Sequence, residues 1–215
     1  MTINKNILFD IQNLLKLSEQ KAELLIVTKN RSIDDIVEFI NLNQKNFGEN
    51  RVQEAKKKFI DTGLKDKYAL HLSLIGPLQS NKVISALTIF DTIQSIDRFK
   101  IIDEIFKGLK SGIKIRTKNF FIQVNIGLEE QKSGVNPCDL KEIYQYALNH
   151  DLSIEGIMCI PPNHSNPEIY FKKMIDLKNN INPNFKVSMG MSNDYQLALA
   201  CGSNILRVGS LLFND

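Results

Sequence analysis

The chain has 215 residues, of which 43% are hydrophobic and 24% charged, and its 11 Gly and 6 Pro are too few for a collagen-like or disordered chain. This composition is typical of a globular protein large enough to bury its own core. The net charge is only +3, which points to neither nucleic acid nor a membrane surface as a partner.

The cysteines and the amino terminus bear on the cellular compartment. Cys138, Cys159 and Cys201 are too widely spaced for a disulfide framework or a metal-binding pair, so we expect them to act as small buried hydrophobic side chains. The first residues, MTINKNILFDIQNLLK, show no signal-peptide pattern, and no stretch reaches the roughly 18 apolar residues of a membrane span. We therefore expect a cytoplasmic protein.

Helical and strand-like patterns alternate along the whole chain, without a linker, which predicts one domain over residues 1–215. Ile7, Ile11 and Leu14 have helical spacing, and Ser32 with Asp35 forms a capping-box signature for a second helix. Short apolar runs typical of buried strands cover residues 23–28, 45–47, 70–75, 89–94, 120–125, 154–158, 185–188 and 205–208. Eight such strands alternating with amphipathic helices predict an α/β fold, a single (β/α)8 TIM-like barrel rather than an open doubly wound sheet.

In such a barrel the functional residues lie where the strands end. Lys29 directly follows the first strand, where apolar walls could desolvate its amine for attack on an aldehyde. The alternative is a solvated lysine beside a helix. Gly48 permits a tight turn after the second strand. Asn50 could then present its amide to a ligand or cap a helix from Arg51.

Other strand ends carry turn and phosphate-binding patterns. In IGPLQSNK, Gly76 and Pro77 break a strand and Ser80 or Asn81 can cap the next helix, so we interpret this segment as structural. The loops after the last two strands contain residues suited to a phosphate, Ser192, Gly209 and Ser210.

Some polar residues lie in less distinctive settings. Arg207 lies within an apolar strand and needs either an acidic partner or a ligand acceptor. His71, His150 and His164 lack metal-ligand spacing. The lysines at 56–58 are interpreted as a solvated helix face, with an RNA-binding patch as the alternative.

Several ordered segments together resemble the pyridoxal-phosphate homeostasis protein family, also described as proline synthetase co-transcribed homologues. The resemblance runs nearly end to end and is carried by LLIVTKNRSIDDI, FGENRVQEA, LIGPLQSNKV, SIDRF, VNIGLEEQKSGV, IEGIMCIPP, SMGMSNDYQLA and LRVGSLLF. It implies a barrel of the alanine racemase N-terminal-domain type (fold type III PLP-binding) that binds pyridoxal 5′-phosphate (PLP).

The resemblance also implies roles for particular residues. Lys29 would hold PLP as a Schiff base, and Asn50 would border the ring. Ser192, Gly209 and Ser210 would hold the phosphate, and Arg207 would face the pyridine nitrogen. One departure is Ser73, which replaces the His that relatives usually carry, so no role is transferred to that His; Ser210 stands where Thr is common.

The implied function is a monomeric, non-enzymatic PLP-binding protein of vitamin B6 and amino-acid homeostasis, with transfer of PLP to PLP-dependent apoenzymes as a further expectation. A cationic Arg207 beside the ring nitrogen would weaken PLP as an electron sink. Racemases of this type take a second acid/base from a further β domain, for which we expect no counterpart in 215 residues. The alternatives are a PLP-dependent amino-acid racemase or decarboxylase, and an RNA- or partner-binding protein.

Overall fold

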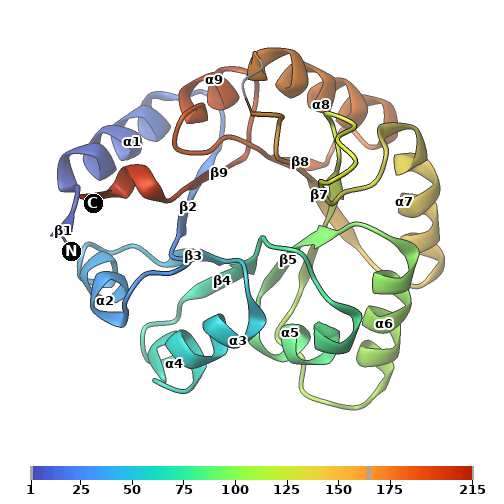
Figure 1. Cartoon of the computed structure of the whole chain (residues 1–215), viewed down its shortest axis with the longest axis horizontal. Coiled ribbons are helices and arrows are strands. Elements are labelled where there is room, and N and C mark those ends of the chain that lie inside the picture. The colour runs from blue at the N-terminus through green and yellow to red at the C-terminus, as the bar shows by residue number, and fades with distance from the viewer. Residues whose placement is uncertain (1, 164–165, 215) are drawn as a thin grey trace.

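A closed parallel barrel forms the centre of the protein. The computed structural model describes residues 2–163 and 166–214. Within these residues, eight parallel strands pair in chain order and the last pairs with the first (Figure 1). The barrel strands are β2 (Glu23–Val27), β3 (Asn46–Glu49), β4 (His71–Leu74), β5 (Thr92–Ile96), β6 (Asn119–Val124), β7 (Ile154–Cys159), β8 (Lys186–Ser188) and β9 (Ile205–Val208). The (β/α)8 barrel expected from the sequence is confirmed.

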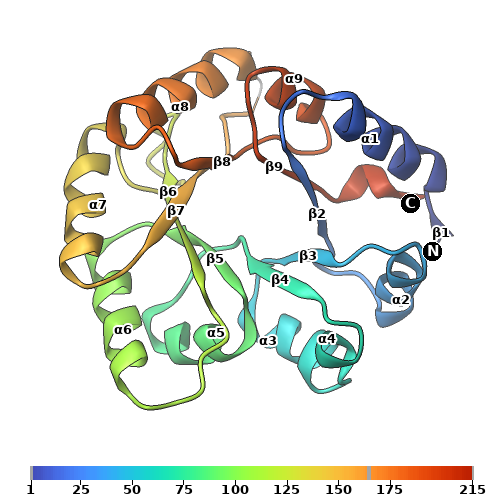
Figure 2. The same ribbon diagram turned by 180° about the vertical axis from the view of Figure 1, so that it is seen from behind.

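Helices surround the barrel, as both views show (Figures 1 and 2). They are α1 (Lys5–Leu17), α2 (Ile33–Asn41), α3 (Val52–Ala55), α4 (Leu64–Lys67), α5 (Val83–Ile89), α6 (Phe99–Lys110), α7 (Leu140–Asn149), α8 (Pro167–Ile181) and α9 (Tyr195–Ala200). A π-helical turn, Lys56–Ile60, continues α3, and 3-10 turns cover Ser80–Lys82, Pro137–Asp139 and Ser210–Leu212. The apolar faces of these helices pack on the outer wall of the barrel in one continuous core.

Local sequence signals explain several element boundaries. The Ser32 side chain accepts a hydrogen bond from the Asp35 backbone while the Asp35 carboxylate accepts from the Ser32 backbone, so the predicted capping box starts α2. Gly156 lies where β7 approaches β8, and a Cβ there would be 2.1 Å from the Lys186 carbonyl oxygen. Only glycine fits at this point of the barrel wall.

Other expectations about local structure were wrong. Residues 89–91 are not strand: Ile89 ends α5, and β5 starts only at Thr92. Gly48 is not in a turn, because β3 continues through it to Glu49. Ser80 and Asn81 do not cap α5, whose N-cap is Lys82 without a side-chain hydrogen bond.

The two ends of the chain meet outside the barrel. The short strands β1 (Thr2–Ile3) and β10 (Phe213–Asn214) form an antiparallel pair beside α1 and α2 (Figure 1). This pair was not expected, since two residues per strand give no detectable alternation.

Candidate functional site

A cavity of about 520 Å³ opens at the carboxyl ends of the barrel strands. Its volume lies within the range of small-molecule sites. The six residues predicted from the sequence all line it: Lys29, Asn50, Ser192, Arg207, Gly209 and Ser210. Lys29 and Asn50 come from the first quarter of the chain and the other four residues from its last 24 positions, so it is the closure of the barrel that brings them together.

Lys29 and Asn50 lie side by side on neighbouring strand ends. Lys29 follows the buried Val27 and Thr28 and is itself exposed toward the cavity. Asn50 does not cap a helix, because α3 starts after Arg51 without a side-chain cap. A Cβ on Gly76 would be 2.3 Å from the Asn50 carbonyl oxygen, so the glycine allows β4 and its loop to approach Asn50 closely.

Hydroxyl and backbone N–H groups gather in the loops that follow β8 and β9, next to the end of β2. The Ser192 Oγ lies 3.4 Å from the backbone nitrogens of both Gly209 and Leu211, and the Ser210 hydroxyl donates to it at 3.1 Å. These residues lie at the start of the Ser210–Leu212 turn. Several donors directed at one small volume form a site for an anionic group.

Gly209 keeps this wall thin. A Cβ on Gly209 would be only 3.2 Å from Val27 Cβ and 3.3 Å from Val27 O, so a larger residue would crowd the end of β2. The missing side chain leaves the backbone open to a ligand from the cavity side.

Arg207 is buried, with 4% of its surface exposed, and borders the cavity from inside the barrel. Its guanidinium donates to the Ser188 hydroxyl at 2.8 Å and to the Cys159 carbonyl at 2.7 Å. The acidic partner considered from the sequence is not among its recorded contacts in the described part of the chain. Burial lowers the pKa of Arg207, while the nearby Cys159 and Asp194 oppose that shift.

A hydrogen-bond chain holds Arg207 in place. The Ser188 hydroxyl, which accepts from Arg207, donates to the side-chain amide oxygen (Oε1) of Gln94 at 2.7 Å, and both residues are buried. A guanidinium has five N–H groups, so donors remain beyond these two bonds for a ligand. Burial raises the pKa of the neighbouring Cys159 thiol to about 12, which keeps it protonated and unreactive.

A second, polar cavity of about 350 Å³ lies at the amino ends of the strands. Ser73 lines this cavity, and so does His71, which bonds Thr92 at 2.9 Å. The departure at Ser73 therefore lies outside the carboxyl-end site. His150 packs against Tyr146 and Phe106, and His164 lies outside the described residues. No group of three His, Cys, Asp or Glu suited to a metal occurs among residues 2–163 and 166–214.

Sequence reasoning missed some residues of the site. Pro161 and Pro162 line the cavity within a motif that carried the resemblance, but periodicity gave them no role. Asp194 also lines it, and its carboxylate accepts from the Met191 backbone at 2.6 Å, which holds the 191–194 loop. The available signal for Asp194 was its position three residues after Met191, because Asp side chains often accept hydrogen bonds from the backbone of their own loop.

Two further expectations are corrected by the structure. Lys56 and Lys57 are exposed, but Lys58 is 8% exposed and ion-paired, so the three do not form one solvated face. Only Cys159 is a buried thiol, since Cys138 is exposed and Cys201 is half-buried. In the part of the chain that is described, no helix has the length and apolar character needed to cross a membrane.

Comparisons with known proteins place these observations in a family context. No protein-family model matches the chain. The pyridoxal phosphate homeostasis protein of Aquifex aeolicus is 40% identical, covering 92% of this chain and 88% of that protein. The protein of the same name from Helicobacter pylori is 36% identical, with 90% and 88% covered.

Solved structures agree with this similarity. PipY from Synechococcus elongatus, in a structure with PLP bound, superposes with a TM-score of 0.81 and 31% identity, covering 97% of this chain and 100% of that one. Alanine racemase from Clostridium difficile gives a TM-score of 0.71 at 13% identity, covering 99% of this chain and 57% of that one. The racemase shows a shared fold only.

Proposed function

The chain belongs to the pyridoxal phosphate homeostasis protein family, and from this premise we propose that it is a single-domain PLP-binding protein that holds the cofactor covalently on Lys29. One observation carries the proposal. Lys29 is the lysine that lines the carboxyl-end cavity, together with Arg207 and the Ser192, Gly209 and Ser210 donors.

The anion-binding wall fits a phosphate monoester. The backbone N–H groups of Gly209 and Leu211 and the hydroxyl of Ser210 are neutral donors directed at the Ser192 hydroxyl, which has its own proton to donate. Such donors at the start of a helical turn bind phosphate through hydrogen bonds and the local backbone dipoles. The lack of a Cβ at Gly209 lets this backbone lie against Val27 at the end of β2.

Arg207 fits the pyridine nitrogen. Its position is fixed by Ser188 and by the Cys159 carbonyl, so the cation cannot turn away from the cavity without losing two buried hydrogen bonds. A cationic donor disfavours protonation of a ring nitrogen beside it. This arrangement favours holding the cofactor over stabilising carbanions, and the curated relatives are named as homeostasis proteins.

Lys29 supplies the amine. When bound, PLP contributes an aldehyde that links reversibly to a primary amine. The apolar walls formed by Val27, Ile75 and Ile160 border the same cavity, and Asn50 closes it beside Lys29.

We further propose that the protein acts in the cytoplasm, as a monomer that passes PLP to PLP-dependent apoenzymes. Cys138, Cys159 and Cys201 are free thiols, as is usual for proteins of a reducing compartment. Light scattering at micromolar concentration checks the oligomeric state, and a dimer mass contradicts this part of the proposal.

Titration of PLP into the wild-type chain and into Lys29→Ala tests the central assignment. We expect the absorbance band of PLP to move to longer wavelength in the wild type and to stay at the position of free PLP in the variant, since a methyl side chain offers no amine. Lys65→Ala is the control, because Lys65 is nearly buried and pairs with Asp91 away from the cavity. The same shift of the PLP band in Lys29→Ala contradicts the proposal.

A further inference from the structure

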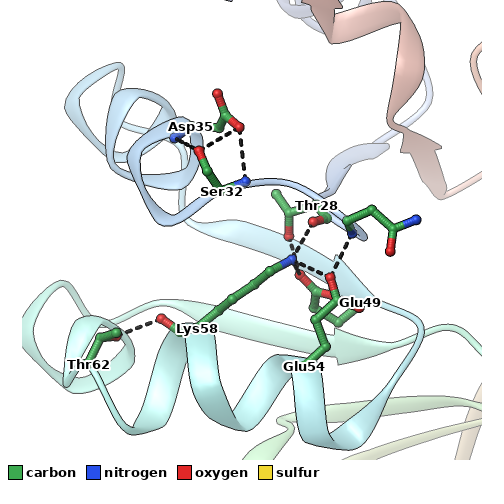
Figure 3. A network of polar contacts seen from close by, with 8 residues as sticks. Thr28, Ser32, Asp35, Glu49, Glu54, Lys58 and Thr62 are labelled. Atoms are coloured by element: carbon green, nitrogen blue, oxygen red, sulfur yellow. Dashed lines mark hydrogen bonds and ion pairs between the residues drawn. The ribbon is translucent and has the colours of Figure 1, made fainter. Parts of the chain in front are cut away.

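A buried ion-pair network around Lys58 contacts Thr28, the residue before Lys29 (Figure 3). Its centre is the Lys58 ammonium, which donates to Glu54 Oε1 at 2.6 Å, to the Thr28 carbonyl at 2.7 Å and to Glu49 Oε1 at 3.0 Å. An ammonium has three donors, so each one is used. Glu49 is fully buried and also accepts from the Thr28 hydroxyl at 2.7 Å.

The network holds both residues that flank Lys29. On one side, Thr28 is bound through its hydroxyl by Glu49 and through its carbonyl by Lys58. On the other side, the Asn30 backbone N–H donates to Glu54 Oε1 at 2.6 Å. Lys29 therefore lies between two anchored residues.

The turn after Lys29 needs such an anchor. Asn30 has φ of 59°, in the left-handed region that residues other than glycine adopt at a cost. The hydrogen bond to Glu54 compensates part of this cost and fixes the direction in which the chain leaves β2. Without it, the Lys29 backbone could relax toward other conformations.

Strand alternation separates the network from the cavity. Val27 lines the cavity, so Thr28 points to the opposite side of the barrel wall, and Lys29 returns to the cavity side. Glu49 and Asn50 follow the same alternation on β3, with Asn50 in the cavity. The network does not line the site, so it acts on a ligand only through the backbone that carries Lys29 and Asn50.

Stability alone does not account for this arrangement. Burying charges costs desolvation energy, and buried ion pairs often stabilise a fold no better than apolar residues would. Here Glu49 Oε2 is buried with no hydrogen-bond partner in the described residues, and burial raises the Glu49 pKa although Lys58 and Thr28 oppose the shift. Lys58 itself lies in a π-helical turn, a local irregularity that often occurs at functional sites.

We propose that Lys58, through Glu49 and Glu54, is a positioning residue that holds the turn at residues 28–30 so that the Lys29 amine faces the aldehyde of a bound cofactor. This inference rests on the proposed function. It predicts a specific defect on loss of the network: the covalent link at Lys29 forms more slowly and less completely, while the cofactor's phosphate and ring still bind.

Two probes separate the two steps. PLP reports the covalent link through its visible band, and pyridoxine 5′-phosphate, which has no aldehyde, reports noncovalent binding by calorimetry. In Lys58→Met, which keeps the side-chain length but donates no hydrogen bond, we expect the covalent link to form about tenfold more slowly or more. We expect the affinity for pyridoxine 5′-phosphate to change less than about twofold.

Matched variants keep the test independent of folding. Lys65→Met removes another nearly buried ammonium, which pairs with Asp91 and donates to the Leu70 carbonyl near the amino end of β4, and should leave both probes unchanged. Glu54→Ala removes the acceptor of Asn30 at a side chain that is 20% exposed, so it serves if Lys58→Met does not fold. It should slow the covalent link in the same way.

The outcomes also separate this inference from the proposed function. If the wild type forms no covalent link at Lys29, both are contradicted. If the wild type forms it and the two network variants form it at the wild-type rate, only the positioning role is contradicted. Equal weakening of both probes in Lys58→Met and Glu54→Ala also contradicts it, because the network would then support the whole cavity rather than Lys29.

Discussion

At the scale of single residues, Ser192 is the point on which the anion-binding wall converges. Its hydroxyl oxygen lies within 3.4 Å of two backbone nitrogens and one further hydroxyl. No charged side chain is needed in such a site, since several dipoles directed at one point provide the attraction. A bound phosphate would share these donors with Ser192 and gain its hydroxyl as one more.

Ser192→Ala should therefore weaken phosphate binding selectively. Loss of one hydrogen bond of about 1 kcal/mol corresponds to about a fivefold loss of affinity for PLP. Pyridoxal, which lacks the phosphate, should bind both proteins equally, and calorimetric titration with the two compounds measures the difference. An equal loss for both compounds would show that Ser192 does not act through the phosphate.

At the scale of elements, the contact between β3 and the α3 helix with its π turn contains a carboxyl whose titration couples to folding. Burial raises the pKa of Glu49 above its ordinary 4.5. Below pH 4.5 the carboxyl is protonated in both the folded and the unfolded chain, and its contribution to stability is fully present. As pH rises toward the raised folded pKa, the unfolded chain loses this proton first, so the contribution is lost.

Glu49→Gln removes this titration while keeping an acceptor for Thr28. The free energy of unfolding of the wild type, relative to the variant, should fall as pH rises above 4.5, by at most about 1.4 kcal/mol per pH unit. Urea denaturation across this pH range measures the difference, and a rise with pH would mean that the Lys58 ion pair outweighs the burial of Glu49.

The same element shows where sequence reasoning reaches its limit. Local patterns located the strands that position Lys29, Asn50 and Arg207, because apolar runs and turn residues are properties of neighbours in the chain. The burial of Lys58 depends on Thr28, thirty residues away, and on Glu49 at the end of β3. Three consecutive lysines carry no mark of which one turns inward, so the solvated-face interpretation failed there.

At the scale of the whole molecule, the alternation of strands and helices was sufficient to predict a closed barrel and the carboxyl strand ends where its cavity lies. It could not predict that the two ends of the chain form a strand pair, β1 with β10. Phe213 on β10 is 5% exposed, its ring lies 5.5 Å from that of Phe39 on α2, and the Arg31 guanidinium lies 4.0 Å from its centroid. These contacts depend on tertiary structure, and no periodicity reveals them.

Phe213→Ala tests how much this closure contributes. Loss of a buried aromatic ring should lower the free energy of unfolding by about 3–5 kcal/mol. Phe9→Ala is the control, since Phe9 is 60% exposed, and should change stability by no more than about 0.5 kcal/mol. Urea denaturation of both variants gives the comparison, and equal effects would show that the joined ends add nothing.

Covalent binding of PLP at Lys29 is tested most directly by trapping the link chemically and locating it in the sequence. Wild-type protein loaded with PLP is reduced with borohydride, digested, and analysed by peptide mass spectrometry. We expect the visible band to disappear and a pyridoxyl group to be found on the peptide that contains Lys29. A pyridoxyl group on other lysines with Lys29 unmodified, or none on any peptide, would contradict it.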